Sequence, residues 1–330
     1  MGNYHAKFSA FGSYAPAKIL TNQDLEKMVD TSDEWIRTRT GMVERHIASA
    51  EEAASDLAYQ AAVNAIEASK VKYKEIDAII VATISGDHPF PSTACILQKR
   101  LGLKGIPAFD VSAGCTGFIY ACDIARQYVE NGAASHILVV GVEILTKITN
   151  WNDRNTCVLF GDASGAAVIS KAEATDISRI IDSKIDADGS QGEFLIQVAG
   201  GSRLPASHET VDANQHTVHM EGNRIFKNAI KSMFASSDEL LRRNHIGPSD
   251  IDWVIPHQAN LRIIEALADK MKIPMSKVIV NIQKYGNTSS ATIPLAIDEA
   301  IRTKKIRRGE ILLLTSFGAG LTWGSILARY

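Results

Sequence analysis

Short apolar runs, separated by polar stretches and glycine-marked turns, form the dominant pattern of this chain. The segments 76–81, 106–111 and 137–141 are short and apolar, as expected of buried β-strands. Between the second and the third, apolar residues recur at helical spacing, at Phe118, Ile119, Cys122, Ala125 and Val129. Buried strands that alternate with helices favour mainly parallel sheets between helical layers, so the pattern predicts an α/β fold.

The second half of the chain repeats the landmarks of the first. Three pairs of segments recur at a nearly constant offset: 76–81 and 251–256 at 175 (251 minus 76), 114–117 and 286–289 at 172 (286 minus 114), and 137–141 and 311–314 at 174 (311 minus 137). Chance similarity is the alternative, because buried apolar strands look alike in any α/β protein. The nearly constant spacing favours a duplicated α/β unit.

The boundary between the two halves is predicted at a polar stretch. Residues 170–176 lack apolar periodicity, which divides the chain into an N-terminal half, 1–173, and a C-terminal half, 174–330. Residues 186–219 carry repeated Gly, Ser, Asp and His, and we expect an extended surface excursion there. A helix is predicted to follow over about 222–242.

Composition narrows the class of protein. The 330 residues are 45% hydrophobic and carry a net charge of −2, which is typical of a globular enzyme and argues against nucleic acid as a general partner. The apolar runs are too short to span a membrane. Four cysteines without a C-x-x-C pair indicate neither zinc nor disulfides, and reduced thiols suit the cytoplasm. The absence of P-loop, G-x-G-x-x-G and H-E-x-x-H motifs predicts no metal and no bound cofactor.

Cys115 is the candidate nucleophile. It lies where an apolar strand gives way to a helix, between small residues that permit a sharp turn. Unpaired N–H groups and the helix dipole at such a junction predict a lowered thiol pKa. Most single cysteines are small core residues instead, and we assign that role to Cys95, Cys122 and Cys157.

The duplication predicts two partners for Cys115. The turn that holds Cys115 in the first half corresponds to the turn that holds Asn287 in the second. His257 follows the strand 251–256, at the C-terminal edge where the sites of α/β proteins collect. A single histidine is usually an ordinary core or surface residue. His257 differs because it lies at the end of a predicted strand. We therefore expect the side chains of Cys115, His257 and Asn287 to face one pocket.

These segments resemble motifs of the thiolase-fold condensing enzymes, specifically β-ketoacyl-acyl-carrier-protein synthase III. An asparagine at 287 points to the initiating type, because elongating synthases of this fold typically use a cysteine and two histidines. The resemblance runs nearly end to end and rests on Asp30-Thr-Ser-Asp-Glu-Trp-Ile36, Thr38-Arg-Thr-Gly41, Ser112-Ala-Gly-Cys-Thr-Gly117, Phe160-Gly-Asp162, Met220-Glu-Gly-Asn223, His257-Gln-Ala-Asn260, Gly286-Asn-Thr-Ser289 and Phe317-Gly-Ala-Gly-Leu-Thr-Trp323.

The resemblance implies a fold and an activity. The fold would be two thiolase-like α/β halves in αβαβα layers with mixed, mainly parallel sheets. The activity would be decarboxylative Claisen condensation of a short acyl-CoA primer, with acetyl-CoA expected, and malonyl-acyl carrier protein. This reaction gives 3-oxoacyl-ACP and starts fatty acid biosynthesis. Cys115 would carry the acyl group in a ping-pong mechanism, and His257 and Asn287 would donate hydrogen bonds to the enolate oxygen.

The resemblance also implies roles for further residues. Backbone N–H groups of Cys115 and Ala319 would form the oxyanion hole, although relatives commonly have three glycines where this chain has Gly318, Ala319 and Gly320. A Cβ at position 319 restricts backbone angles with positive φ. Phe90 would close the acyl tunnel across the interface of a homodimer. CoA would contact Trp35, Arg39, Arg154 and Asn260, and the carrier protein would contact Gln258, Ala259, Asn260, Leu261 and Arg262.

Three other functions remain open from the sequence. A Cys-His-Asn hydrolase would cleave thioesters or peptides without a malonyl donor. A related initiating enzyme of secondary metabolism would carry nearly the same chemical core. A noncatalytic protein that binds acyl carriers would have no need of His257 and Asn287 beside a nucleophile. The length and branching of the primer are left open, because acyl groups differ by methylenes worth about 0.8 kcal/mol each.

Overall fold

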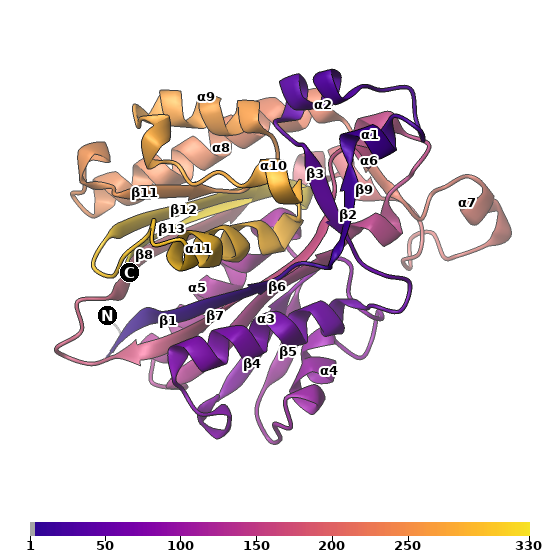
Figure 1. Ribbon diagram of the computed structural model, residues 1–330. Coiled ribbons are helices and arrows are strands. Elements are labelled where there is room, and N and C mark those ends of the chain that lie inside the picture. The colour runs from indigo at the N-terminus through magenta and orange to yellow at the C-terminus, as the bar shows by residue number, and fades with distance from the viewer. Residues whose placement is uncertain (1–3) are drawn as a thin grey trace.

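A five-stranded mixed sheet forms the N-terminal half of the computed structural model, which describes residues 4–330 (Figure 1). The strand order is β1-β7-β6-β4-β5. β4 pairs in parallel with β5 and β6, whereas β7 is antiparallel to β6 and β1. The strands are β1 (His5–Tyr14), β4 (Ala78–Ala82), β5 (Ala108–Val111), β6 (His136–Ile144) and β7 (Asp162–Ala172).

A four-stranded sheet in the C-terminal half has the same layout. Its order is β11-β12-β13-β8, with β11 and β12 parallel and the other pairs antiparallel. A single parallel bridge joins Val254 of β11 to Val278. It occupies the edge position that corresponds to β5 beside β4 in the first sheet. The strands are β8 (Arg179–Ala187), β11 (Trp253–Pro256), β12 (Ile311–Gly318) and β13 (Thr322–Arg329). The shared order confirms the predicted duplication. The boundary at 173/174 falls between β7 and β8, and as a domain boundary it stays a prediction.

Helices separate and cover the two sheets in five αβαβα layers, as predicted. Helices α5 (Gly117–Glu130) and α11 (Thr292–Arg302) lie between the sheets, in one core cluster with residues of both. Helices α3 (Ala54–Ser69) and α4 (Thr93–Arg100) cover the outer face of the first sheet. Helices α8 (Gly222–Arg243) and α9 (Leu261–Met271) cover the second.

The stripe predicted on α5 shows why this helix is central. Phe118, Ile119, Cys122, Ala125 and Val129 are each at most 1% exposed, and all belong to the central core cluster. Full burial of a large apolar side chain stabilises a fold by about 1.5–3 kcal/mol. The central helices therefore fix the sheets to each other, and with them the turns at the strand ends.

The cysteines and the segment 186–219 differ in part from what the sequence predicted. Cys122 and Cys157 are buried as predicted, but Cys95 is exposed, so its assignment to the core is wrong. Cys95 lies on a face of α4 that turns away from the apolar cluster around Leu97. The predicted excursion over 186–219 contains β9 (Leu195–Gln197), α7 (His208–Asp212) and β10 (Val218–Met220), with α7 projecting from the body (Figure 1).

Smaller elements lie around the C-terminal ends of the central strands. Strands β2 (Lys18–Thr21) and β3 (Glu44–Ile47) form a two-stranded sheet, and the short helices are α1 (Asn22–Leu25), α2 (Asp33–Thr40), α6 (Arg154–Cys157) and α10 (Ile282–Tyr285). Among residues 4–330, no helix combines the length and the apolar character that crossing a membrane requires.

We predict that Gly141→Ala lowers stability. A Cβ at Gly141 in β6 would lie 2.3 Å from the carbonyl oxygen of Ser290, and backbone cannot give way as a side chain can. We expect a loss of about 1–3 kcal/mol in the free energy of unfolding, measured by chemical denaturation. Gly189→Ala is the control, because a Cβ there meets nothing within 4 Å. Equal stability of the two variants would contradict this packing.

Candidate active site

Cys115 lies in a turn that other backbone approaches very closely. The turn is the short 3-10 segment η2 (Gly114–Thr116) at the start of α5. A Cβ at Gly318 would lie 2.5 Å from the backbone nitrogen of Cys115, so this approach requires glycine. The hydroxyl of Ser316 donates to the carbonyl oxygen of Cys115 over 2.8 Å. The backbone of Cys115 is therefore held against the end of β12.

The thiol of Cys115 does not have the lowered pKa that the helix N-terminus predicted. Burial raises its pKa to about 12, with a smaller raising effect of the Glu143 carboxylate and a partly offsetting one of the Ser289 hydroxyl. The direction is opposite to the one predicted from the helix N-terminus, because burial removes the water that would stabilise a thiolate. Cys115 is therefore a protonated thiol at neutral pH.

His257 follows β11 and turns one ring nitrogen into a cavity. Its backbone N–H donates to Thr315, and its Nδ1 lies 2.8 Å from the Thr292 hydroxyl. Its Nε2 is buried and has no hydrogen-bond partner within residues 4–330. Burial lowers the pKa of His257 to about 3, so the ring is neutral. Nε2 is thus available to a reacting group.

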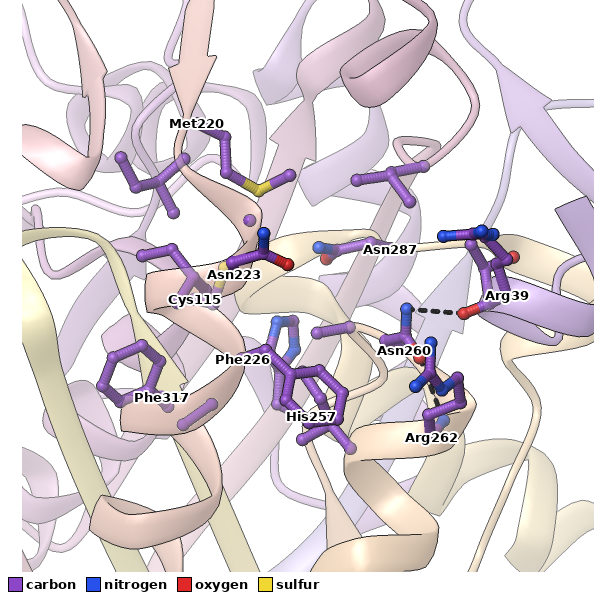
Figure 2. Close-up of a pocket in the computed structure, with 18 of the residues that line it drawn as sticks. Arg39, Cys115, Met220, Asn223, Phe226, His257, Asn260, Arg262, Asn287 and Phe317 are labelled. Carbon is purple, nitrogen blue, oxygen red and sulfur yellow. Dashed lines mark hydrogen bonds between the residues drawn. The ribbon is translucent and has the colours of Figure 1, made fainter. Parts of the chain in front are cut away.

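Asn287 presents the nitrogen of its amide to the same cavity. Its Oδ1 accepts the backbone N–H of Ser289 over 2.9 Å, and its own backbone N–H donates to Leu159 over 2.9 Å. Because the oxygen is occupied, the amide NH2 group is the part left to donate. Figure 2 shows Cys115, His257 and Asn287 around one space.

That space is a cavity of about 670 Å³, which opens toward α2 and α9. Cys115, His257 and Asn287 line its buried part. Its walls are largely apolar, and its outer part carries polar and cationic groups. The apolar wall includes Leu195, Met220, Phe226, Met233 and Phe317, and the outer part includes Trp35, Arg39, Asn260 and Arg262. A ligand with an apolar end and an anionic end suits this shape.

The residues expected to bind CoA gather at the outer part of the cavity. The guanidinium carbons of Arg39 and Arg154 each lie 5.2 Å from the ring centre of Trp35. Trp35 and Arg39 line the cavity, and Arg154 also donates to the carbonyl oxygen of Asp30. Asn260 caps α9 and donates to the carbonyl oxygen of Arg39 over 3.0 Å, which ties α9 to α2 (Figure 2).

The residues expected to bind the carrier protein divide into accessible and buried ones. Arg262 is exposed at the cavity, with its guanidinium 5.6 Å from the ring of Phe226, and Ala259 and Leu261 are partly buried. Gln258 is only 1% exposed, and its amide bonds to backbone groups of Pro256, Ile279 and Asn281. The expectation that Gln258 meets a carrier protein is therefore wrong, because its side chain holds the end of β11 instead.

Ala319 lies in the loop that packs on the Cys115 turn. A Cβ at Gly114 would lie 2.7 Å from the backbone nitrogen of Ala319. Ala319 does not adopt a positive φ; Gly320 and Leu321 do, at +75° and +44°. The Cβ of Ala319 therefore brings no left-handed strain, and its N–H lies beside the Cys115 turn.

Phe90 and Glu143 lie outside the lining of the cavity. Phe90 is 86% exposed and does not belong to the cavity lining of the described chain. Glu143, which we did not predict, is fully buried at the end of β6 and accepts hydrogen bonds from the turn after Asn287. The sequence signal that could have indicated Glu143 is a single acidic residue in the otherwise apolar run 137–144. A carboxylate buried in such a strand needs several hydrogen-bond donors around it.

The part of the chain that the structure describes contains no group of three or more His, Cys, Asp or Glu side chains placed to hold a metal ion. The side chains that meet in the buried part of the cavity are instead a thiol, an imidazole and a carboxamide, carried on turns at the ends of duplicated central strands. A fold of this kind with this site defines the thiolase-fold condensing enzymes.

The chain belongs to the β-ketoacyl-acyl-carrier-protein synthase III family, whose members are acyltransferases that initiate fatty acid synthesis. The models 3-oxoacyl-[acyl-carrier-protein] synthase III and its C-terminal part match residues 109–189 and 241–330. The family resemblance inferred from the sequence is thus confirmed.

Three relatives illustrate this membership. A β-ketoacyl-[acyl-carrier-protein] synthase III of Caldanaerobacter subterraneus is 54% identical over 97% of this chain and 96% of that protein. The crystal structure of 3-oxoacyl-[acyl-carrier-protein] synthase III from Aquifex aeolicus is 47% identical, with a TM-score of 0.90 over 98% of this chain and all of that one. The priming β-ketosynthase of the R1128 polyketide pathway is 31% identical, with a TM-score of 0.90 over 98% and 96% of the two chains.

We predict that alkylation of Cys115 by iodoacetamide rises with pH without a plateau near neutrality. The reactive species is the thiolate, and a thiol with a pKa of about 12 forms more of it throughout the alkaline range. The rate should still be rising at about pH 10. It is measured by intact mass in a Cys95→Ala background, which removes the exposed thiol. A plateau below about pH 8 would show a thiolate at neutral pH instead.

We predict that Thr292→Val slows the overall reaction about tenfold, since it removes both hydrogen bonds of this hydroxyl, and the one that orients the His257 ring is worth about 1–1.5 kcal/mol. The Thr292 hydroxyl is the partner of His257 Nδ1. Thr292→Ser keeps a hydroxyl and should restore most of the rate. Turnover is measured beside the free energy of unfolding, and equal rates for the Val and Ser variants would exclude this role of the hydroxyl.

Proposed function

We propose that this chain condenses a short acyl-CoA primer, acetyl-CoA first among them, with malonyl-acyl carrier protein. The product is 3-oxoacyl-ACP, and the reaction starts fatty acid biosynthesis. The observation that carries the proposal is the buried part of the cavity, where a nucleophilic sulfur faces two groups suited to donate hydrogen bonds, His257 Nε2 and the Asn287 amide. We propose the cytoplasm as its location, and no cofactor of its own is needed for this chemistry.

In the first half-reaction, the sulfur of Cys115 attacks the thioester carbonyl of the primer. A bond forms between this sulfur and the acyl carbon, and the bond between that carbon and the sulfur of CoA breaks. Backbone N–H groups of Cys115 and Ala319 hold the oxyanion, which is supported by the close packing of their two loops. One such donor is worth about 3–4 kcal/mol of barrier. The proton of the Cys115 thiol is lost as the bond to the acyl carbon forms and the CoA sulfur gains one, so that an acyl-enzyme and free CoA thiol result.

In the second half-reaction, malonyl-carrier protein enters and loses CO2, which leaves an enolate. His257 and Asn287 donate hydrogen bonds to the enolate oxygen, so the hydrogen of the neutral His257 ring must be on Nε2. In that tautomer, Nδ1 accepts from the Thr292 hydroxyl, which must then turn its proton away from the Ser289 carbonyl oxygen, its other acceptor at 2.9 Å. The enolate carbon then attacks the acyl carbonyl, and Cys115 leaves.

The outer part of the cavity binds the two substrates in turn. Trp35 and the cationic Arg39 and Arg154 offer stacking and charge to the nucleotide of CoA, and Asn260 fixes the backbone beside Arg39. Ala259, Leu261 and the exposed Arg262 form the face for the acidic carrier protein, for which charge complementarity mainly raises the rate of encounter. Gln258 has no part in it.

We further propose that the enzyme is a homodimer in which Phe90 of each copy closes the acyl tunnel of the other. Two features support a second copy. β5 is an edge strand, with one side unpaired in the described chain, and the large apolar side chain of Phe90 is 86% exposed. A phenylalanine at the end of the tunnel favours a short primer.

The first test is the intact mass of the protein after incubation with acetyl-CoA, followed by malonyl-carrier protein. We expect an adduct of about 42 Da that Cys115→Ala lacks and that malonyl-carrier protein discharges as the acetoacetyl product. An adduct only with longer acyl-CoA would change the primer. Discharge to free acid without malonyl donor would favour a Cys-His-Asn hydrolase. This chain is also similar to a priming synthase of polyketide synthesis. A malonyl-carrier protein from such a pathway is therefore the second donor to test.

Asn287→Asp separates the two half-reactions. Aspartate keeps an oxygen for the Ser289 N–H but loses the amide donor. We expect acylation by acetyl-CoA to stay within a few-fold of the parent, while decarboxylation of the malonyl thioester falls by about 10²–10³. An equal loss in both steps would contradict a role confined to the enolate.

A further inference from the structure

Gln258, the residue after His257, has a buried side-chain amide that bonds three backbone groups. Its Nε2 donates to the carbonyl oxygen of Pro256 over 2.8 Å and to that of Ile279 over 3.2 Å. Its Oε1 accepts the N–H of Asn281 over 3.1 Å. The proposed reaction gives this amide no part, although it lies next in the chain to one of the two groups that donate to the enolate.

The amide of Gln258 lies where a backbone ladder beside β11 is interrupted. A parallel bridge joins Val254 to Val278, and the N–H of Ile279 donates to the carbonyl oxygen of Val254 over 2.9 Å. The next bond of a parallel ladder would run from the N–H of position 256 to the carbonyl oxygen of Ile279. The bond after that would run from the N–H of Asn281 to the carbonyl oxygen of position 256. Position 256 is a proline, which has no N–H to donate.

Gln258 supplies the donor that this proline lacks. Its amide donates to the carbonyl oxygen of Ile279 in place of the missing N–H. It also bonds both partners of the following rung, the carbonyl oxygen of Pro256 and the N–H of Asn281. A side-chain amide has the same kinds of donor and acceptor as a peptide group, with one more donor hydrogen. The ladder is thus continued through a side chain, and three buried backbone groups are satisfied.

This continued ladder joins the segments that carry the two donors. β11 ends one residue before His257, and Asn281 lies immediately before α10. Asn287 follows α10 after a single glycine. That glycine, Gly286, has φ of +63°, and a Cβ there would lie 2.8 Å from a backbone carbonyl oxygen. The path from the amide of Gln258 to Asn287 is therefore one short helix and one tightly packed residue.

The same segment is fixed to α11, the helix that orients the ring of His257. The side-chain amide of Asn281 donates to Glu299 Oε2 on α11 over 2.9 Å. Thr292, the first residue of α11, places its hydroxyl 2.8 Å from His257 Nδ1. Hydrogen bonds and short stretches of chain thus form a closed circuit, which runs from His257 through Gln258 and Asn281 to α11 and back to His257.

We propose that Gln258 is a positioning residue that sets the spacing between His257 Nε2 and the Asn287 amide. This inference rests on the proposed function, in which both groups bind one enolate oxygen. Two donors serve one oxygen only when both lie within hydrogen-bond distance of the same point, and a misplacement of about 1 Å can cost about a hundredfold in rate. A link from the strand of one donor to the segment of the other fixes this spacing more directly than separate anchors do.

The first experiment replaces Gln258 by methionine, which has nearly the same length but no amide. We expect kcat of the overall condensation to fall at least about tenfold, because the donors lose their alignment. The KM for malonyl-carrier protein should stay within about twofold of the parent value. A direct contact with the carrier protein predicts the reverse, and a raised KM with unchanged kcat would overturn the proposal.

Gln98→Met is the matched control for this substitution. The Gln98 amide also donates to a backbone carbonyl oxygen, that of Ile106 over 2.7 Å, just before the start of β5. The Cys115 turn follows the other end of β5. This variant loses the same chemical group far along the strand from the reacting thiol, so kcat and KM should match those of the parent. The free energy of unfolding is measured for both variants.

A double-mutant cycle with Asn287→Ala separates positioning from a general loss of structure. Once one donor is removed, the spacing of the pair no longer matters. Gln258→Met should therefore slow decarboxylation less than about threefold in the Asn287→Ala background, against at least about tenfold in the parent. Decarboxylation is measured as CO2 released from malonyl-carrier protein. Additive losses in the two backgrounds would overturn the proposal, since a general loss of structure is independent of Asn287.

Gln258→Glu keeps the proposal testable if the methionine variant does not fold. A protonated carboxyl at this position can accept the Asn281 N–H and donate to one carbonyl oxygen, whereas an ionised one faces carbonyl oxygens without a hydrogen to donate. We expect kcat relative to the parent to fall as pH rises through the pKa of this carboxyl, which burial raises. A ratio that stays constant with pH would contradict the bonding assigned to the amide.

Failure of the proposed function would give a different result. If the parent protein neither forms an acyl adduct at Cys115 nor decarboxylates malonyl-carrier protein, the function on which this inference rests is wrong. If the parent does both and Gln258→Met matches it in kcat, only the positioning role of Gln258 is overturned.

Discussion

The close approach of three backbone turns is the constraint on which the rest of the structure depends. The Cys115 turn, the loop at Gly318 and the turn after Asn287 come from distant parts of the chain, yet they pack without side chains between them. A Cβ at Gly318 would come within 2.5 Å of the Cys115 backbone, and a Cβ at Gly141 in β6 would come within 2.3 Å of the Ser290 carbonyl oxygen in the turn after Asn287. The central helices α5 and α11 begin at two of these turns, so packing between the sheets and positioning of the reacting groups are one arrangement.

Such packing excludes water, and the loss of water controls the chemistry of the site. The same burial raises the pKa of Cys115 and lowers that of His257, which leaves a neutral thiol beside a neutral ring. Polar atoms in this region are mostly paired within the protein, as Gln258 and Asn260 show. The unpaired His257 Nε2 and the Asn287 amide point to the cavity, where a developing negative charge would meet them.

Much of the fold could be predicted from the sequence because its signals are local or repeated. The apolar stripe from Phe118 to Val129 predicts α5, and the constant offset between the halves predicts two sheets of one design. The meeting of Cys115, His257 and Asn287 at the cavity was predictable from the repeat as well, because equivalent turns of the two halves lie at equivalent strand ends. Gln258 was misassigned because its motif places it beside surface residues, whereas its side chain turns inward to three backbone groups.

The sequence by itself determined the family, the duplicated architecture and which three side chains meet in the buried part of the cavity, because these depend on residue type and spacing along the chain. Only the tertiary structure decided their protonation. The helix that begins at Cys115 is visible in the sequence, but the depth at which its first turn is buried is not, and that burial raises the pKa of the thiol. The hydrogen bonds of the buried Glu143 carboxylate with Ser289 and Ser290 were likewise hidden, because these residues meet only when separate segments fold together.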